Sequence, residues 1–489
     1  YQNTYMKNST KNGLAVPGFY SITNSKDAIT PDVSYQRKQL NSVYGNLSLG
    51  FKNAIFADVS GRNDWSSTLP VDQISYFYPS AGASVVLSEL LPLPDVMKFW
   101  KLRGSWTVSK TDLGVYAINQ TYGISLGAWD SFNSANYPEN IRGSVNPITN
   151  RTYELGTSLY FFDNNRLKLD FAYYNRLRYD DTRQVDISLA SGFKKMLVNI
   201  DEQTVLRGFE VTVDAVPVTT GDFKWNVTAN WSKYGNYYAK LDETFSSKAP
   251  WVKVGNRTDF VSGVDYQRDP QGNIVHDNSG LPIVNSSYNI PCGYTNPDWI
   301  WGLGNNFTYK RWTLNINFDG RVGGSTINEL DRYSWANGSN YASDNQWRYD
   351  EVVNGLKNYV GNGVRLVSGS VKYDSYGQIT EDTRVFEPNT TQVSYQAYIK
   401  RWSGTNHLKE FFQDLTFFKL RELSLAYDVP YLYAKKIGAN RASVSVVGQN
   451  LLLWVKEFKY SDPDKGLSGN NDLPAPSVRY IGVNLNLSF

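Results

Sequence analysis

Residues 480–489 read YIGVNLNLSF, and this segment decides the fold. Every second residue from Ile481 to Phe489 is apolar, and Gly, Asn or Ser stands between them. Because successive side chains of a strand point to opposite faces, the segment predicts a strand with one apolar and one polar face. Such a strand suits the wall of a membrane barrel, which has lipid on one side and water on the other. The alternative is an edge strand of a soluble β-sandwich that happens to end the chain.

The same period of two recurs upstream. In residues 312–319, Trp, Leu, Ile and Phe alternate with Thr, Asn, Asn and Asp, and residues 225–232 alternate in the same way. The pattern predicts an all-β fold with about thirteen antiparallel strands. They are expected near residues 36–51, 54–64, 75–88, 97–109, 151–162, 166–180, 205–216, 223–236, 298–309, 312–324, 413–428, 441–456 and 477–489.

The connections between these strands alternate between short and long. Outer-membrane barrels have short periplasmic turns and long extracellular loops, so the alternation orients the predicted barrel. We expect one barrel unit over residues 1–489, with an extracellular loop at 1–35 and the strands and loops at 36–489. A closed barrel needs an even strand count, and unpaired strand edges are costly in lipid. An odd number of strands is therefore expected to lie outside this sequence, in the same protein or in a second chain. The long connections are expected at 65–74, 110–150, 181–204, 237–297, 325–412 and 457–476.

The amino-acid composition excludes several other classes of protein. Of the 489 residues, 15% are aromatic, and no stretch of about 18 apolar residues could form a transmembrane helix. The net charge of +3 is small and dispersed, which argues against a nucleic-acid partner. Cys292 is the single cysteine, so no internal disulfide is expected. The chain starts at Tyr1 without a signal peptide, so we expect any export signal to lie upstream or to have been removed.

Several motifs occur in the order that one family would give. The stretch GRNDWSSTLP at 61–70 followed by FYPS at 77–80 is the most specific of them. Further along the chain are RGFE at 207–210, FKLR at 418–421, LAYDVP at 425–430, GQNLL at 448–452 and DPD at 462–464. Together they resemble the C-terminal barrel portion of SusC/RagA-like TonB-dependent outer-membrane transporters.

This resemblance implies a barrel of 22 strands in the bacterial outer membrane, closed by a plug. The plug and the segment that contacts TonB are expected outside this chain. The implied function is import of oligosaccharides together with a SusD-like surface lipoprotein that acts as a lid. Two alternatives stay open: import of oligopeptides, as in RagA-like members, and a structural or assembly role in an outer-membrane complex. The resemblance also implies contact with outer-membrane lipid and with the barrel assembly machinery.

The family motifs are expected to serve structure. Gly61, Arg62, Asn63 and Asp64 would end a strand at the outer rim, and Trp65 would anchor at the membrane interface. Gln449 and Asn450 interrupt the alternation and are expected to form hydrogen bonds inside the barrel. The final strand resembles the C-terminal signal of barrel assembly. The residues that carry this signal are Tyr480, Val483, Leu485, Leu487 and Phe489.

Ligand specificity is expected in the long loops, because long loops on a rigid scaffold are often functional. Aromatic faces can cover the C–H faces of a sugar while amides and carboxylates bind its hydroxyl groups. The alternative is that these rings pack the loops together or dock a partner protein. The ligand-binding candidates are Trp129, Asp130, Trp335, Tyr341, Trp347 and Trp402.

No catalytic, cofactor or metal site is expected. The only histidines are His276 and His407, and neither lies beside a catalytic motif. The stretch DPQGNIVHDNSG at 269–280 lacks the distal Glu of a calcium loop. It favours a hairpin with two glycine-containing turns instead.

Overall fold

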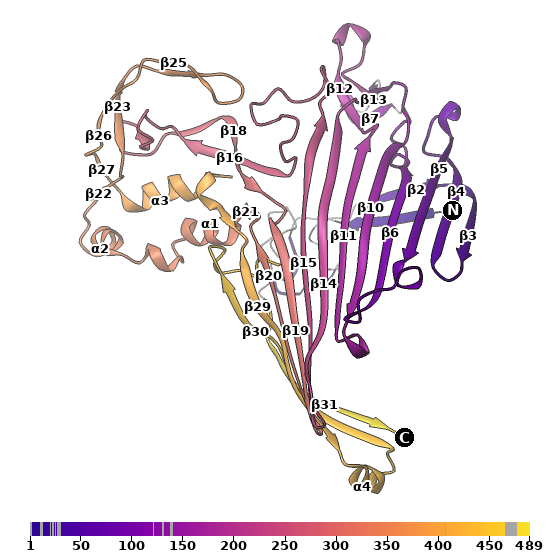
Figure 1. Cartoon of the computed structure of the whole chain (residues 1–489). Helices are drawn as coiled ribbons and strands as arrows, with labels where there is room; N and C mark the ends of the chain where they lie inside the picture. The colour runs from indigo at the N-terminus through magenta and orange to yellow at the C-terminus, as the bar shows by residue number, and fades with distance from the viewer. Residues whose placement is uncertain are drawn as a thin grey trace.

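The computed structural model describes residues 2–9, 13–19, 21, 24, 26, 31–120, 122–129, 132–136, 140–405, 407–464 and 477–489. Its main feature is an antiparallel sheet of 13 strands, each paired with the next one along it (Figure 1). The count of strands predicted from the alternation is therefore confirmed. In sheet order the strands are β3 (Leu40–Phe51), β4 (Ile55–Ser66), β5 (Ser75–Val86), β6 (Met97–Thr111), β10 (Ile148–Phe161), β11 (Leu167–Tyr179), β14 (Gln203–Thr219), β15 (Phe223–Lys240), β19 (Trp299–Tyr309), β20 (Trp312–Val322), β29 (Phe417–Val429), β30 (Arg441–Val455) and β31 (Tyr480–Ser488).

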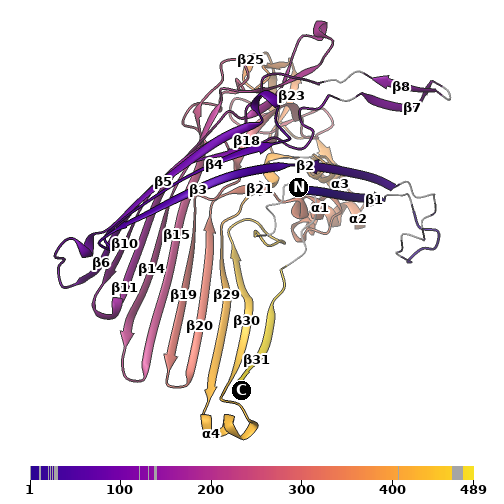
Figure 2. The ribbon, with the colours of Figure 1, turned by 90° about the vertical axis from the view of Figure 1, so that its right-hand side faces the viewer.

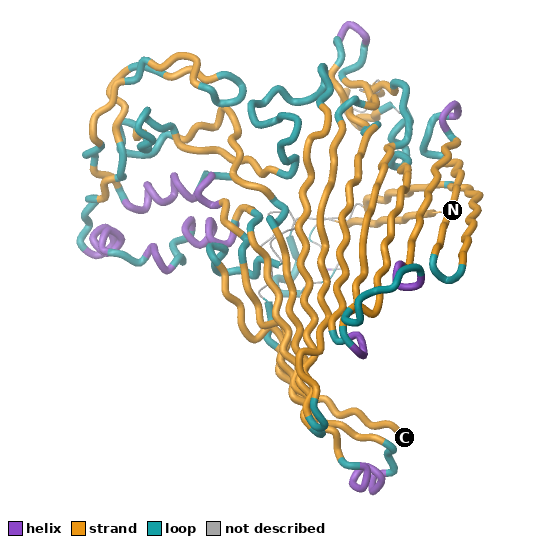
Figure 3. Tube along the Cα trace, in the orientation of Figure 1, coloured by secondary structure: helices purple, strands orange, loops and turns teal. Residues whose placement is uncertain are grey.

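The sheet is curved and open (Figure 2). Within the described residues, β3 and β31 stand at its two ends, each paired with one neighbour of the sheet. Short connections gather at one end of the strands and long connections at the other (Figure 3). Lys52, Asn53 and Lys310 turn the chain with positive φ angles of 51°, 52° and 52° in two of the short connections.

Cross-strand register divides the sheet into a polar face and an apolar face. Ser48 pairs with Asp58, and both lie on the polar face, whereas Leu47 pairs with Val59 on the apolar face. The apolar face is bare: Leu47 is 57% exposed, and Val483 is 74% exposed. A soluble sheet would cover such a face with a second layer, because burying apolar area is the main driving force of folding.

The two longest connections fold together at the end of the sheet where the long connections lie, and we call this unit the loop body (residues 241–298 and 323–416). A buried cluster of Tyr266, Leu408 and Phe411 joins the two connections, and Trp335 and Trp402 pack against it. None of the described helices is long and apolar enough to span a membrane. The elements of the loop body are β16 (Phe260–Tyr266), β17 (Val275–His276), β18 (Val284–Tyr294), β21 (Ser325–Ile327), α1 (Glu329–Ala336), η6 (Tyr341–Ser343), α2 (Gln346–Val353), β22 (Tyr359–Val360), β23 (Val364–Ser368), β24 (Val371–Tyr373), β25 (Ile379–Asp382), β26 (Val385–Pro388), β27 (Gln392–Val393), α3 (Tyr395–Ser403), η7 (Lys409–Phe411) and β28 (Phe412–Asp414).

Smaller pieces of sheet complete the structure. β1 (Gln2–Ser9) pairs with β2 (Pro31–Lys38), which continues through Gln39 into β3. Residues 1–35, expected to be a loop, therefore include most of a hairpin, and their extracellular location stays a prediction. The other small strands are β7 (Gly123–Trp129), β8 (Phe132–Asn136), β9 (Asn140–Arg142), β12 (Thr182–Asp186) and β13 (Lys195–Asn199).

Candidate functional site

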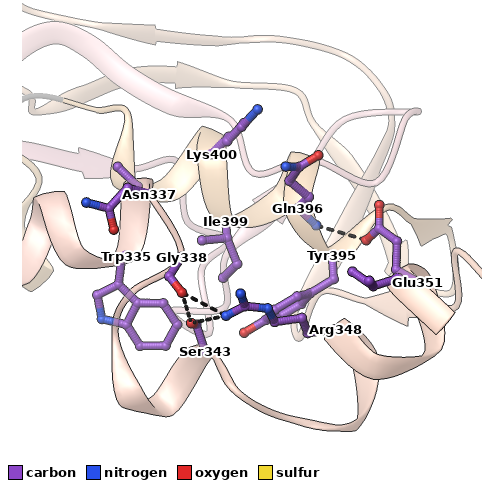
Figure 4. Close-up of a pocket in the computed structure, with 12 residues that line it drawn as sticks. Trp335, Asn337, Gly338, Ser343, Arg348, Glu351, Tyr395, Gln396, Ile399 and Lys400 are labelled. Carbon is purple, nitrogen blue, oxygen red and sulfur yellow. Dashed lines mark hydrogen bonds between the residues drawn. The ribbon is translucent and has the colours of Figure 1, made fainter.

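A pocket of about 430 Å³ opens between the helices α1, α2 and α3 of the loop body. Figure 4 shows the indole of Trp335 on one side of it, with Arg348 and Tyr395 facing it across the pocket. Tyr395 is buried, whereas Gln396 and Lys400 are exposed. The pocket thus combines an aromatic wall with polar groups at its opening, which is the usual composition of a small-ligand site.

Hydrogen bonds hold the three helices in place around the pocket. The carboxylate of Glu351, on α2, accepts from Ser394 Oγ at 2.5 Å and from Gln396 N at 3.0 Å, at the start of α3. Burial acts to raise the pKa of Glu351, but these hydrogen bonds outweigh it and lower the pKa below its ordinary value. Asn345 Nδ2 also donates to Tyr395 Oη at 2.7 Å. The carboxylate is therefore charged, and its hydrogen bonds hold the start of α3 in position.

Arg348 closes one side of the pocket. Its Nη1 donates to Gly338 O at 2.7 Å and to Ser343 Oγ at 3.0 Å, which ties α2 to the turn after α1. Since Arg348 and Glu351 are already bonded, Gln396 and Lys400 are the polar groups best placed to meet a ligand. An amide and an ammonium group can both form hydrogen bonds with hydroxyl or carbonyl oxygens.

Two of the six predicted ligand residues pack the loops. The rings of Trp335 and Trp402 meet edge to face with centroids 4.8 Å apart, and Trp402 lies 4.7 Å from the ring of Phe411. Trp402 Nε1 donates to Glu410 Oε2 at 3.1 Å. Trp402 is therefore part of the loop-body core, as the packing alternative proposed, while Trp335 packs and also lines the pocket.

Of the other four predicted residues, the structure describes the side chains of two. Tyr341 is 87% exposed, and Trp347 is 46% exposed with its ring edge against Tyr359 at 5.4 Å. Neither of them lines the pocket. Trp129 ends β7, but its side chain and the whole of Asp130 lie outside the described residues. Of the four candidates whose side chains the structure describes, Trp335 alone lines the pocket.

Sequence reasoning missed the helices that build the pocket. The expected loops were assigned no helix, yet Asn328, Asn345 and Ser394 cap α1, α2 and α3, each accepting a hydrogen bond from the backbone three residues on. Asn and Ser are strongly preferred at this position. These three caps are the signal that could have located the helices, and with them Gln396 and Lys400.

The DPQGNIVHDNSG stretch forms two turns, as expected. Gly272 and Gly280 have positive φ angles of 88° and 80°. Asp269 Oδ1 accepts from the backbone of Gln271 and Asn273, so its carboxylate serves the turn. Among the residues that the structure describes, no three His, Cys, Asp or Glu side chains are grouped to hold a metal ion.

The family model described as "TonB dependent receptor-like, beta-barrel" matches residues 1–273, which is more than half of the chain. The chain belongs to this family. TonB-dependent receptor P26 of Formosa agariphila is 25% identical over 96% of this chain and 48% of its own length. TonB-dependent receptor SusC of Bacteroides thetaiotaomicron is 23% identical over 51% of this chain and 26% of its own length. The chain spans about half the length of P26.

Solved structures agree on the fold. The RagAB peptide transporter superposes with a TM-score of 0.69 at 18% identity, covering 97% of this chain and 50% of that one. The RagAB peptide importer in its closed-closed state gives 0.68 at the same identity. The predicted SusC/RagA-like barrel and its outer-membrane location are confirmed. The prediction that the chain is not an enzyme is confirmed as well, because this is a family of receptors and transporters.

In a TonB-dependent barrel the apolar face meets lipid and the polar face lines the lumen. The GRNDW motif divides between these two faces. Arg62 Nε donates to Asp64 Oδ1 at 2.7 Å, and Tyr78 Oη donates to Asp64 Oδ2 at 2.8 Å, so these side chains form a lumenal network. Gly61, Asn63 and Trp65 lie on the same face of β4 as Val59, which is the lipid side. The expectation that residues 61–64 end the strand is wrong: β4 continues to Ser66, because this part of β4 still pairs with β5.

Asn450 and Leu451, directly after Gln449, form a β-bulge. Glu422 pairs with Gln449 while Leu420 pairs with Leu452, so two residues, Asn450 and Leu451, stand opposite Arg421 alone. Asn450 adopts a positive φ of 53°, which Asn tolerates better than most residues. Its Nδ2 donates to Val478 O at 3.2 Å, which links β30 to the start of the last strand.

The last strand matches its predicted pattern in geometry. β31 pairs with β30 in continuous register, and Val483 and Leu485 stand on the lipid side with Val446 and Val444. Phe489 is 76% exposed and Tyr480 is 58% exposed. The role of Tyr480, Val483, Leu485, Leu487 and Phe489 as an assembly signal stays a prediction.

Proposed function

We propose that the chain forms part of the barrel of a TonB-dependent importer of oligosaccharides. Membership of the receptor family and the match to SusC support TonB-dependent uptake across the outer membrane. The observation that carries the substrate class is the pocket of the loop body, where Trp335 provides an aromatic wall below the exposed side chains of Gln396 and Lys400. Such a pocket can bind a sugar ring by its C–H face and its hydroxyl groups.

A SusD-like surface lipoprotein is the proposed partner. The structures similar to this chain include that of the RagAB peptide transporter. In our chain, Tyr341, Val352 and Val353 are 87%, 76% and 60% exposed on the loop body, which leaves apolar surface for a lid to cover. The relatives extend beyond the region matched here, and we place the contact with TonB in that part.

Uptake measurements on the full-length protein test this proposal. Cells that express the gene and cells that lack it would receive fluorescent oligosaccharides or fluorescent tryptic peptides, with and without a protonophore. We expect oligosaccharide uptake to require both the gene and the proton gradient. If only peptide uptake depends on the gene, the substrate class is wrong. If neither does, a structural or assembly role replaces transport.

A double variant, Gln396→Ala with Lys400→Ala, tests the pocket itself. Both side chains are exposed, so the fold should persist while oligosaccharide uptake falls by about tenfold, corresponding to about 1.4 kcal/mol of binding free energy. Lys372→Ala is the matched control, because Lys372 is also an exposed lysine of the loop body but does not line the pocket. Equal uptake by the double variant and the control would show that the pocket does not bind the transported oligosaccharide.

A further inference from the structure

The connection between β29 and β30 differs from the tight turns at the same end of the sheet. Residues 430–440 fold into a short helix α4 (Tyr431–Ala434) and a 3-10 turn η8 (Lys435–Ile437), whereas β19 and β20 are joined by Lys310 and Arg311 alone. Figures 1 and 2 show α4 at the tip of the sheet, beside the C-terminus. We call residues 430–440 the helical turn.

The helical turn folds over the lipid-facing side of the strands. Ala434 and Ala439 form a buried cluster with Ala442, and Val429 packs against it. Val429 pairs with Ala442, and both lie on the apolar face. Ala434, Ala439 and Ala442 are 0%, 2% and 3% exposed, and their small side chains let the turn approach the strands closely. The turn therefore sits beside the lipid rather than under the lumen.

The outer surface of the helical turn combines apolar, aromatic and cationic groups. Lys435 Nζ lies 5.9 Å from the centre of the Tyr431 ring, and Lys436 Nζ lies 5.8 Å from that of Tyr433. The exposed apolar and aromatic side chains of the turn are Tyr431 (57%), Leu432 (69%), Tyr433 (58%) and Ile437 (59%). Segments that lie in a membrane interface have this composition, because the rings and aliphatic groups enter the lipid while the lysines reach the headgroups.

The neighbouring turn extends the same surface. Trp312 and Tyr427 contact each other on the apolar face with ring centroids 4.7 Å apart, and Trp312 is 47% exposed. Asp428 N donates to Arg311 O at 2.8 Å, which brings the cationic Arg311 next to the helical turn. An aromatic band with cations at its edge is complementary to the apolar and anionic layers of a phospholipid leaflet.

We propose that the helical turn anchors the barrel in the periplasmic leaflet of the outer membrane by binding phospholipid phosphate groups through Lys435 and Lys436. The inference rests on family membership, which orients the short connections toward the periplasm, and it is independent of the transported substrate. The charge of the two lysines and the apolar surface beside them favour a lipid over a soluble periplasmic protein. The turn would then fix the depth of the neighbouring strands in the membrane.

Native mass spectrometry of the full-length protein in detergent, titrated with phosphatidylglycerol, tests this anchor. We expect Lys435→Glu with Lys436→Glu to weaken lipid binding by about tenfold, the equivalent of about 1.4 kcal/mol. Lys52→Glu with Lys224→Glu reverses two exposed lysines near other short connections and should weaken it far less. Inorganic phosphate alone should not compete.

A folding assay and a milder variant complete this test. Heat-modifiable migration on gels shows whether each variant barrel has folded, and Lys435→Gln with Lys436→Gln gives a milder change if the reversal prevents folding. Equal lipid binding by the two charge reversals, or by the wild type and the milder variant, would overturn the proposal. If a periplasmic protein crosslinks to the wild-type turn and the lysine variants bind lipid as well as the wild type does, that protein and not a lipid is the partner of the turn.

Discussion

Lys419 Nζ lies 2.6 Å and 2.8 Å from the two carboxylate oxygens of Asp462, and the two side chains are only 2% and 4% exposed. Lys419 stands on the lumenal face of β29, and Asp462 lies in the connection that follows β30. Asp464 adds a second contact to Lys419 at 2.6 Å and also accepts from Arg421, which is paired with Asp319 of β20. The DPD motif thus fastens the last long connection to the barrel wall.

Asp462→Asn should destabilise this attachment. Removing one partner of a buried ion pair costs about 3–5 kcal/mol where the other charge is left uncompensated, and the remaining contact of Lys419 with Asp464 keeps the cost below that range. We expect faster proteolysis of the connection between β30 and β31 in the assembled protein. Asp464→Asn should have a smaller effect, because the Asp464 side chain is 32% exposed. Unchanged proteolysis of the Asp462 variant would show that the pair does not hold the connection.

Trp402→Ala should loosen the loop body. The Trp402 ring contacts both Trp335 and Phe411, and truncating a large core side chain costs about 3 kcal/mol or more. Hydrogen exchange should accelerate in α1 and α3. Tyr341→Ala is the control, since its side chain is 87% exposed and its loss should leave exchange unchanged. Equal exchange in both variants would contradict the packing role of Trp402.

Asn450→Val should impair assembly of the barrel, whereas Asn450→Gly should be tolerated. The bulge holds residue 450 at a φ of 53°, where a β-branched side chain costs about 1–2 kcal/mol and glycine adopts the angle freely. The yield of heat-modifiable protein in the outer membrane measures the difference. Asn450→Gly still loses the bond to Val478, so a yield as low as that of the valine variant would assign the effect to that bond.

The loop body should lose stability in acid because of His276. This ring is fully buried, with Nδ1 3.2 Å from Val364 O and Nε2 3.1 Å from Tyr398 Oη. Burial lowers the pKa of His276 below 6.5, although backbone hydrogen bonds with Val364 and Ile274 and the nearby charge of Asp277 act in the opposite direction. The folded state therefore binds fewer protons than the unfolded state, and its stability falls as the pH drops below 6.5.

Hydrogen exchange of β17 and β23, measured on either side of pH 6.5, checks this dependence. Protection should decrease on the acid side in the wild type and change less in His276→Gln, which cannot take up a proton. Glu410 also titrates in the loop body, since burial raises its pKa, so Glu410→Gln should be measured alongside. Identical pH profiles of the wild type and the His276 variant would rule out His276 as the cause.

The sheet could be predicted from the sequence because the apolar and polar residues alternate within each strand. In β15, Trp225, Val227 and Ala229 alternate with Asn226 and Thr228, and this pattern alone assigns the faces. The pocket could not be predicted from the sequence, because Glu351 and Ser394, which meet beside it, are 43 residues apart in the chain. No periodic pattern in the sequence indicates a contact between residues so far apart. The bulge lies between these cases: Gln449 and Asn450 showed that the alternation failed, but not that Asn450 takes a positive φ.

The loop body has a consequence for the order of events during biogenesis. Its core joins Tyr266, which precedes β19 and β20, to Leu408 and Phe411, which follow them. Neither connection holds the whole core, so each must cross the membrane before the core can close. The hairpin of β19 and β20 has to be inserted first, with both flanking segments outside. Completion of the loop body would therefore report that this part of the wall is already in place.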